Sequence, residues 1–195
     1  WVGNMEYLSR LKKETGQFEN FNSNSRNLED VDAKSIQSIC RGRDGLIWLG
    51  TGNGIKSFDP HTKAFTHYYY EPGNASGISD YTALAIYADS RDNIWVGTGS
   101  IAFNRFDKKT GRFTHYKNNV MDSTSISSNI VYCVFEDSKH NLWIGTTSGG
   151  LCQYDYAHDN FITHTRGKGL PWNTVLSIQE DKAGNLWLGT ENGLA

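Results

Sequence analysis

The residue types best suited to binding chemistry occur together in one stretch, where Trp172 follows two basic residues, Arg166 and Lys168. The CH faces of a sugar ring can stack on an indole, and a guanidinium or ammonium group pairs with a carboxylate or sulfate. We therefore treat this stretch as a candidate site for a sugar that carries acidic groups. The alternative is that Trp172 packs beneath a neighbouring segment or against a second domain.

A second aromatic group, Tyr69, Tyr70 and Tyr81, brackets another polar stretch of the chain. These rings could also contact a ligand, and the alternative is that they pack at a strand edge or within a loop. The candidate ligand-binding residues are thus Trp172, Arg166, Lys168, Tyr81 and Tyr70.

Carboxylates that could serve as a catalytic acid and base recur at equivalent places along the chain. One set follows a short apolar run, and the other lies six residues before a recurring tryptophan: Asp59, Asp107 and Asp155; Asp89, Asp137 and Asp181. Aspartate at the start of a hairpin accepts hydrogen bonds from the turn, whereas a pair of catalytic carboxylates flanks one bond of the substrate. We predict structural roles for both sets and no catalytic residue in this chain.

The cysteines and histidines show no spacing that is typical of a metal site. Cys40, Cys133 and Cys152 form no CxxC pair, and His67 and His115 occupy equivalent places two residues after a phenylalanine. We expect three buried free thiols in strands, no metal and no cofactor.

The elements that must position these residues come from a motif that recurs from one end of the chain to the other. Its tryptophans are residues 1, 48, 95, 143 and 187, at intervals of 47, 47, 48 and 44. The complete copies contain Trp48, Trp95, Trp143 and Trp187, followed two residues later by Gly50, Gly97, Gly145 and Gly189. A fixed period of this length indicates a repeat architecture, in which the recurring Trp and Gly residues are structural and the tryptophans are buried.

Each period has room for four short strands with tight turns between them. The first strand is expected at residues 35–40, 82–87, 130–135 and 174–179, and the second contains the tryptophan. A four-stranded meander cannot bury two apolar faces alone, but meanders stacked around an axis can. We predict an all-β fold: a β-propeller segment of about four blades, each a four-stranded antiparallel meander, cut from a larger propeller of seven or eight blades.

The predicted organisation is a single partial propeller over residues 1–195. Its parts are a partial blade at 1–30, blades at 31–79, 80–127 and 128–171, and a partial blade at 172–195. The long connections between blades, residues 22–34, 69–81, 117–129 and 165–173, should emerge on one face. The last is four residues shorter than the others and contains Trp172, whose equivalents are Ala33, Asp80 and Ser128. A residue particular to one blade is a better binding candidate than one present in all.

Composition excludes several classes of partner. The 195 residues carry 19 basic and 21 acidic side chains, a net charge of −2, and no basic run that would mark a nucleic-acid-binding surface. No apolar run approaches the roughly 20 residues that span a bilayer, so we expect no direct membrane contact by this segment. Because the chain starts inside one copy of its motif, we expect it to be part of a longer protein.

The repeat closely resembles the two-component regulator propeller repeat. The resemblance is carried by Val175, Ile178, Glu180, Asp181, the run from Gly184 to Thr190, Gly193 and Leu194, with Gly169, Leu170 and Pro171 as the lead-in. The first complete repeat departs from the pattern with Arg41 and Gly42, the second with Ile101 and the third with His140. These single changes do not affect the expected fold, but they make the blades unequal at their surfaces.

The resemblance implies a place in the periplasmic sensor region of a membrane-bound hybrid two-component histidine kinase. Such sensors respond to oligosaccharides released from glycans and signal through distant kinase and receiver domains. Expected partners are an oligosaccharide, the rest of the propeller and a second copy of the whole sensor, with no catalytic chemistry in this segment. The alternatives are a propeller scaffold for protein interactions and, less favoured, a propeller glycosidase or lyase.

Overall fold

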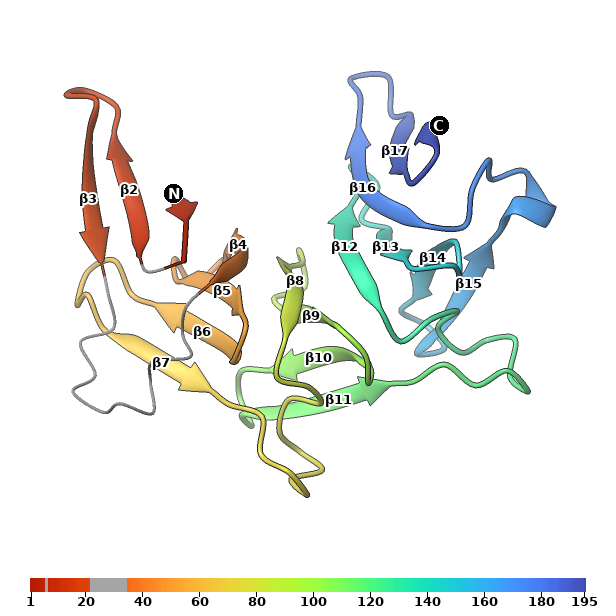
Figure 1. Ribbon diagram of the computed structural model, residues 1–195, viewed down its shortest axis with the longest axis horizontal. Helices are drawn as coiled ribbons and strands as arrows, with labels where there is room; N and C mark the ends of the chain where they lie inside the picture. Colours follow the sequence, from red (N-terminus) through yellow and green to blue (C-terminus); the bar gives the residue numbers. More distant parts are fainter. Residues whose placement is uncertain (6, 22–34) are drawn as a thin grey trace.

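The chain forms five separate antiparallel sheets around one axis in the computed structural model, which describes residues 1–5, 7–21 and 35–195 (Figure 1). Three sheets have four strands, and the first and last have three. The strands are β1 (Val2–Gly3), β2 (Leu8–Lys12), β3 (Gln17–Phe21); β4 (Ile36–Arg41), β5 (Ile47–Thr51), β6 (Gly54–Phe58), β7 (Phe65–Tyr68); β8 (Ala83–Ala88), β9 (Ile94–Thr98), β10 (Phe103–Asp107), β11 (Arg112–Tyr116); β12 (Val131–Glu136), β13 (Leu142–Thr146), β14 (Leu151–Asp155), β15 (Asn160–His164); β16 (Val175–Glu180), β17 (Leu186–Thr190) and β18 (Gly193–Leu194). A short 3₁₀ turn, η2 (Arg166–Lys168), lies between β15 and β16. This arrangement confirms the predicted propeller segment.

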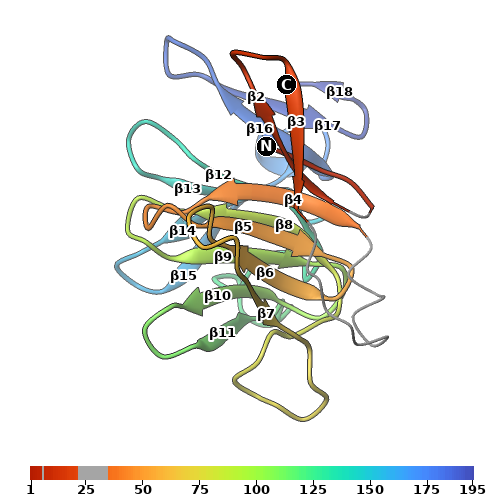
Figure 2. The same cartoon turned by 90° about the vertical axis from the view of Figure 1, so that its left-hand side faces the viewer.

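The first strand of each sheet lies innermost. Figure 1 shows β4, β8, β12 and β16 along the inner side of the curved array, with β7, β11 and β15 outside. Successive inner strands contact one another, and each sheet follows chain order outward. These inner strands begin one residue later than the sequence predicted, for example at Ile36 rather than at residue 35. In the side view of Figure 2, the connection after β7 projects from the body of the sheets.

The inner strands β4, β8, β12 and β16 each contain a β-bulge, and the next inner strand passes close to the recurring glycine. In β12 the register shifts between Val131 and Cys133, and equivalent shifts occur in β4, β8 and β16. A Cβ on Gly97 would lie 2.7 Å from the carbonyl oxygen of Val131, in the inner strand of the next sheet. Glycine is therefore needed because neighbouring backbones approach more closely than a side chain allows.

The recurring tryptophans pack between sheets. The ring centroid of Trp48 lies 5.6 Å from that of Phe106 in the next sheet, and Trp95 lies 4.7 Å from Tyr154 in the same way. Trp48 and Trp95 are only 1% and 0% exposed. Burial of a large aromatic ring against the following sheet is thus a main source of cohesion between blades.

The prediction that all the recurring tryptophans are buried was wrong for Trp1, Trp143 and Trp187. Trp143 is half-buried, and Trp1 and Trp187 are 39% and 46% exposed. Trp143 faces the three-stranded last sheet, no described sheet lies against Trp187, and Trp1 precedes the two-residue strand β1 of the three-stranded first sheet. For Trp143 and Trp187, burial therefore depends on the next sheet rather than on their own.

The connections between sheets also protect the outer strands. The backbone N–H of Phe113 in β11 donates to the carbonyl of Ser76 at 2.9 Å, and Phe161 in β15 donates to Thr124 at 2.8 Å. Connections 69–82 and 117–130 therefore occupy hydrogen-bonding positions on an exposed sheet edge. The predicted first connection, residues 22–34, lies outside the described residues.

Candidate functional site

Trp172 lies where the last two sheets meet. Gly150 N–H donates to the carbonyl of Asn173 at 2.7 Å, and Glu191 N–H donates to the carbonyl of Thr174 at 3.2 Å. Ser148 N–H donates to the hydroxyl of Thr174 at 3.3 Å. These bonds hold the connection 165–174 against the β13–β14 and β17–β18 turns, so three segments distant in the sequence form one site.

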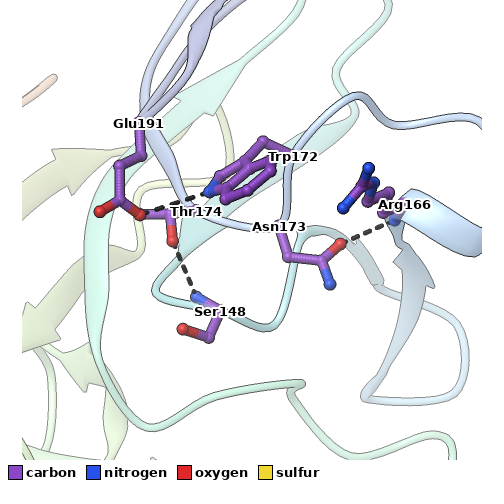
Figure 3. A pocket seen from close by; sticks show the side chains of 6 residues that line it. All are labelled: Ser148, Arg166, Trp172, Asn173, Thr174 and Glu191. Carbon is purple, nitrogen blue, oxygen red and sulfur yellow. Dashed lines mark hydrogen bonds between the residues drawn. The ribbon is translucent and has the colours of Figure 1, made fainter.

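A cavity of about 300 Å³ opens beside Trp172 (Figure 3). The indole is half-buried, and its Nε1 donates to Glu191 Oε2 at 3.4 Å. On the other side of the ring, the Arg166 guanidinium carbon lies 5.2 Å from the ring centroid, within cation–π range. The lining residues are Ser148, Arg166, Trp172, Asn173, Thr174 and Glu191.

The cavity combines an aromatic ring with both hydrogen-bond donors and acceptors. The Arg166 guanidinium supplies donors and Glu191 supplies acceptors. Asn173 Oδ1 accepts from the backbone N–H of Arg166 at 2.7 Å, which fixes the Asn173 carboxamide beside the ring. Sugar hydroxyls can both donate and accept, so they match this mixture. The sequence predicted that Arg166 and Lys168 would both lie beside Trp172. Only Arg166 does, and the second charged group that lines this cavity is the carboxylate of Glu191.

Lys168, the other predicted cation, lies in a different cavity. Its ammonium donates to the carbonyl of Thr163 at 3.1 Å, and its side chain lines a space bounded by connection 117–130. Arg166 and Lys168 therefore serve two neighbouring cavities from opposite ends of η2.

The predicted tyrosines form a third, separate location. The rings of Tyr70 and Tyr81 are 4.5 Å apart in an edge-to-face contact, within connection 69–82. Tyr70 lines a cavity of about 290 Å³ together with Ile101, whereas Tyr81 is 53% exposed. The structure thus brings Trp172 and Arg166 together but places neither tyrosine with them.

Sequence reasoning missed Glu191 as a residue of the Trp172 cavity. Glu191 directly follows the Thr of the recurring motif, where the other copies have Gly52, Gly99 and Thr147. Comparing the repeats at this turn would have identified it as particular to one blade.

The recurring aspartates have the structural roles that the sequence predicted. Asp59 accepts from His61 N–H at 2.8 Å and from the Thr62 hydroxyl at 2.9 Å, and these bonds lower the pKa of Asp59. Asp107 makes the equivalent bonds to Lys109 and Thr110. These carboxylates are occupied in turns and do not converge on one substrate position.

No group of three or more His, Cys, Asp or Glu residues that could hold a metal ion occurs in residues 1–5, 7–21 and 35–195. Nor does this part of the chain contain a helix with the length and apolar character needed to cross a membrane.

Comparison with known proteins matches the repeats individually. The family described as two component regulator propeller matches residues 30–53, 77–100, 125–148 and 169–192. Among the described residues, each match covers an inner strand and a tryptophan strand, and the last three also cover the end of a connection. No curated protein sequence matches the chain.

Three of the similar solved structures come from two bacteria. The extracellular domain of the proposed hybrid two component system BT3049 from B. thetaiotaomicron shares 26% identity and a TM-score of 0.73, over 82% of this chain and 22% of that one. The extracellular domain of BT4673, another proposed hybrid two component system of that organism, shares 24% identity with a TM-score of 0.43, over 99% of this chain and 31% of that one. PorZ, a surface component of the type-IX secretion system of Porphyromonas gingivalis, shares 14% identity with a TM-score of 0.52, over 99% of this chain and 37% of its own. This chain therefore spans about a fifth to a third of the length of its hybrid-system neighbours.

Proposed function

Because the chain belongs to the two-component regulator propeller family, we propose that it is part of the extracytoplasmic sensor of a hybrid two-component regulator. The ligand is a glycan-derived oligosaccharide, and one of its sugar units stacks on Trp172. The proposal is supported by the extracellular domain of BT3049, a proposed hybrid two component system, with which the chain shares a fold and 26% identity.

The main evidence for a ligand-binding site is the cavity at Trp172. Its aromatic ring, cation and carboxylate occur together only at this junction among the described sheets, because the residues equivalent to Trp172 are Asp80 and Ser128. An aromatic platform with a few convergent polar groups is the usual composition of a small-molecule site. A repeat fold does not require this combination, so binding explains it better than folding does.

The cavity lies between two blades, which suggests how binding becomes a signal. Ser148 belongs to one sheet and Glu191 to the next, so a ligand that contacts both favours one arrangement of the blades. In the whole sensor, a membrane-anchored protein of the bacterial periplasm, this preference shifts the equilibrium between arrangements of two paired subunits. The kinase and receiver domains would lie elsewhere in the longer protein.

We propose no catalytic role for this segment. A glycosidase or lyase would place carboxylates from non-equivalent positions around one bond of the substrate. The described carboxylates with that potential, such as Asp59 and Asp107, are instead occupied in equivalent turns. Glu191 is the one carboxylate that lines the Trp172 cavity.

Thermal-shift measurement and calorimetry with neutral and acidic oligosaccharides of two to six sugar units test the proposal. Stabilisation by one glycan class is expected from preferential binding to the folded state. Trp172→Ala should abolish it, Trp172→Phe should retain much of it, and Phe18→Ala, which removes an exposed ring from β3 of the first sheet, should leave it unchanged. No stabilisation by any oligosaccharide, or equal stabilisation of Trp172→Ala, would overturn the ligand site.

A second candidate function is a scaffold for protein interactions, and one observation favours it. Val120 and Met121, adjacent in connection 117–130, are 89% and 90% exposed. Two fully exposed apolar side chains at a loop tip could insert into a protein partner. Met121→Ser should weaken such an interaction without changing oligosaccharide binding at Trp172, because Met121 lines neither that cavity nor the neighbouring one.

A further inference from the structure

A second cavity, of about 270 Å³, shares the η2 connection with the Trp172 cavity. Thr165 and Lys168 line it from that connection, and residues of connection 117–130 form much of the remaining wall. Most of its side chains end in a hydroxyl or a carboxamide, among them Asn118, Asn119, Ser125, Thr163 and Thr165. The cavity is therefore rich in neutral hydrogen-bonding groups.

This composition is particular to one place in the repeat. The equivalent cavity, between connection 69–82 and β11, has different residues at four corresponding positions: Tyr70, Glu71, His115 and Lys117 in place of Asn118, Asn119, Thr163 and Thr165. The propeller fold accommodates both sets. The hydroxyl-rich and amide-rich lining is thus not a requirement of folding.

Hydrogen bonds within connection 117–130 hold the wall in place. Asn118 Nδ2 donates to the carbonyl of Ile126 at 2.8 Å, Ser125 Oγ donates to the carbonyl of Asp122 at 2.8 Å, and Asn119 N–H donates to Ser125 Oγ at 2.9 Å. A wall fixed before binding loses little conformational entropy when a ligand arrives.

Lys168 gives this cavity a cationic hydrogen-bond donor for an acidic group. The Lys168 ammonium has three donors, and its one described bond, to the Thr163 carbonyl, leaves two for a ligand. Asp122, the carboxylate in the wall, is committed to a turn: its Oδ1 accepts from the Thr124 hydroxyl at 2.7 Å and from the Thr124 N–H at 2.9 Å. These bonds lower the pKa of Asp122 and so keep it charged. Lys168 is the lining residue whose remaining donors can meet an acidic group.

We propose that this second cavity binds the carboxylate or sulfate ester of a sugar unit linked to the unit that stacks on Trp172. The inference rests on the proposed function and narrows the ligand to an acidic oligosaccharide of at least two units. Each cavity is at or just below the lower end of the size range of small-molecule sites. Two such spaces joined by η2 suit two linked units better than one large ligand.

Calorimetry with matched disaccharides tests this inference. The probes are digalacturonate, a disaccharide with one sulfate ester, and the neutral digalactoside of the same length. Lys168→Gln should weaken binding of the acidic probes about tenfold, because a charge-assisted contact is lost, and should leave the neutral probe unchanged. Lys168→Arg should restore most of the acidic affinity. Lys182→Gln, which removes an exposed lysine from the β16–β17 turn, is the matched control.

The outcomes separate the two proposals. If Trp172→Ala abolishes binding but Lys168→Gln affects no probe, the second cavity is not an anion site and the Trp172 site stands. If no disaccharide binds the unaltered protein, the proposed function fails and this inference fails with it. Preference for digalacturonate or for the sulfated probe identifies which acidic group the cavity accepts, and a decline of that affinity as salt rises supports the ionic contact.

Discussion

The buried carboxylate of Asp89 accepts a hydrogen bond from the indole Nε1 of Trp95 at 2.7 Å. The same oxygen accepts from the Tyr156 hydroxyl of the next sheet at 2.8 Å, while the other oxygen accepts from the backbone N–H of Asn93 at 2.8 Å. One carboxylate therefore holds its own hairpin, the recurring tryptophan and the neighbouring blade. Asp137 and Asp181 make the equivalent bond to Trp143 and Trp187, each at 2.9 Å.

Replacing Asp89 by alanine should destabilise the protein by about 3 kcal/mol, because several donors lose their acceptor and the Trp95 indole N–H becomes unsatisfied in a dry environment. Urea unfolding measures the loss. Asp181→Ala is the control, since its indole partner is 46% exposed and can bond to water, so a much smaller loss is expected. Equal losses in the two variants would show that the bond to the buried indole is not the source of the stability.

The sheet of β4–β7 lacks this aspartate. Gly42 stands at the equivalent place, and the Nε1 of Trp48, which is 1% exposed, has no described hydrogen-bond partner. A Cβ on Gly42 would collide with Asp44 Oδ1 and would lie 2.9 Å from Trp48 Nε1, so the ring must shift by a few tenths of an ångström. The double variant Gly42→Asp/Asp44→Ala removes the colliding carboxylate and copies the arrangement of Asp181 and Ala183.

This double variant should be about 1 kcal/mol more stable than Asp44→Ala alone, the gain expected when a buried donor acquires a partner. Asp44→Ala is the proper reference because it also removes the ion pair between Asp44 and Lys108. Thermal unfolding of both variants gives the comparison. A double variant no more stable than Asp44→Ala would mean that the strain of inserting the side chain cancels the new bond.

The sequence was sufficient to predict the propeller because the interval from Trp48 to Trp95, and from Trp95 to Trp143, corresponds to one blade. It could not predict the exposure of Trp187, since the partner of each tryptophan belongs to the following sheet. Local periodicity describes a strand's own faces, whereas this burial depends on which sheet lies beside it.

For the site, the sequence identified Trp172 through its difference from Asp80 and Ser128 but could not assign Lys168 to its cavity. In a 3₁₀ turn of three residues per turn, side chains two positions apart point in directions about 120° apart. Arg166 and Lys168 therefore diverge although they are close in sequence. Glu191 was missed for the opposite reason: it is remote in sequence and reaches Trp172 only through the packing of two sheets.

The motif glycine is predicted to be intolerant of even one methyl group. Gly97→Ala places a Cβ 2.7 Å from the Val131 carbonyl oxygen of the next sheet, so a loss of about 1–3 kcal/mol is expected from overpacking. Gly99→Ala, two residues away, is the control, because its Cβ would lie 3.7 Å from Thr82 Cβ in ordinary contact. Thermal unfolding should separate the two variants, and similar stability would contradict the proposed close approach of neighbouring sheets.

The cysteines should be unreactive in the folded protein. Of the three thiols expected to be buried, only Cys152 is fully buried, whereas Cys40 and Cys133 are partly buried. Burial nevertheless raises the pKa of Cys40 and of Cys133 to about 12 in each case. Since the thiolate is the reactive form, a disulfide reagent at pH 8 should label all three only after unfolding in guanidinium. Rapid stoichiometric labelling of the native protein would show that an inner strand opens readily.

Stability should fall in acid, and Asp137 should contribute to the fall. Burial acts to raise the pKa of Asp137, but hydrogen bonds from Trp143 and Asn141 outweigh it and leave the pKa below its ordinary value of 3.8. A carboxyl whose pKa is lower in the folded state stabilises that state above the unfolded pKa, and this contribution is lost as the pH falls through the folded pKa. His164, whose pKa is lowered by burial from its usual 6.5, adds a decline that begins nearer neutrality. Unfolding midpoints of the unaltered protein and of Asp137→Asn, measured from pH 7 to pH 3, should differ most at pH 7 and converge below about pH 4. Because His164 is present in both proteins, its effect cancels in this difference, and a gap that stays constant with pH would show that the bonds to Asp137 do not depend on its charge.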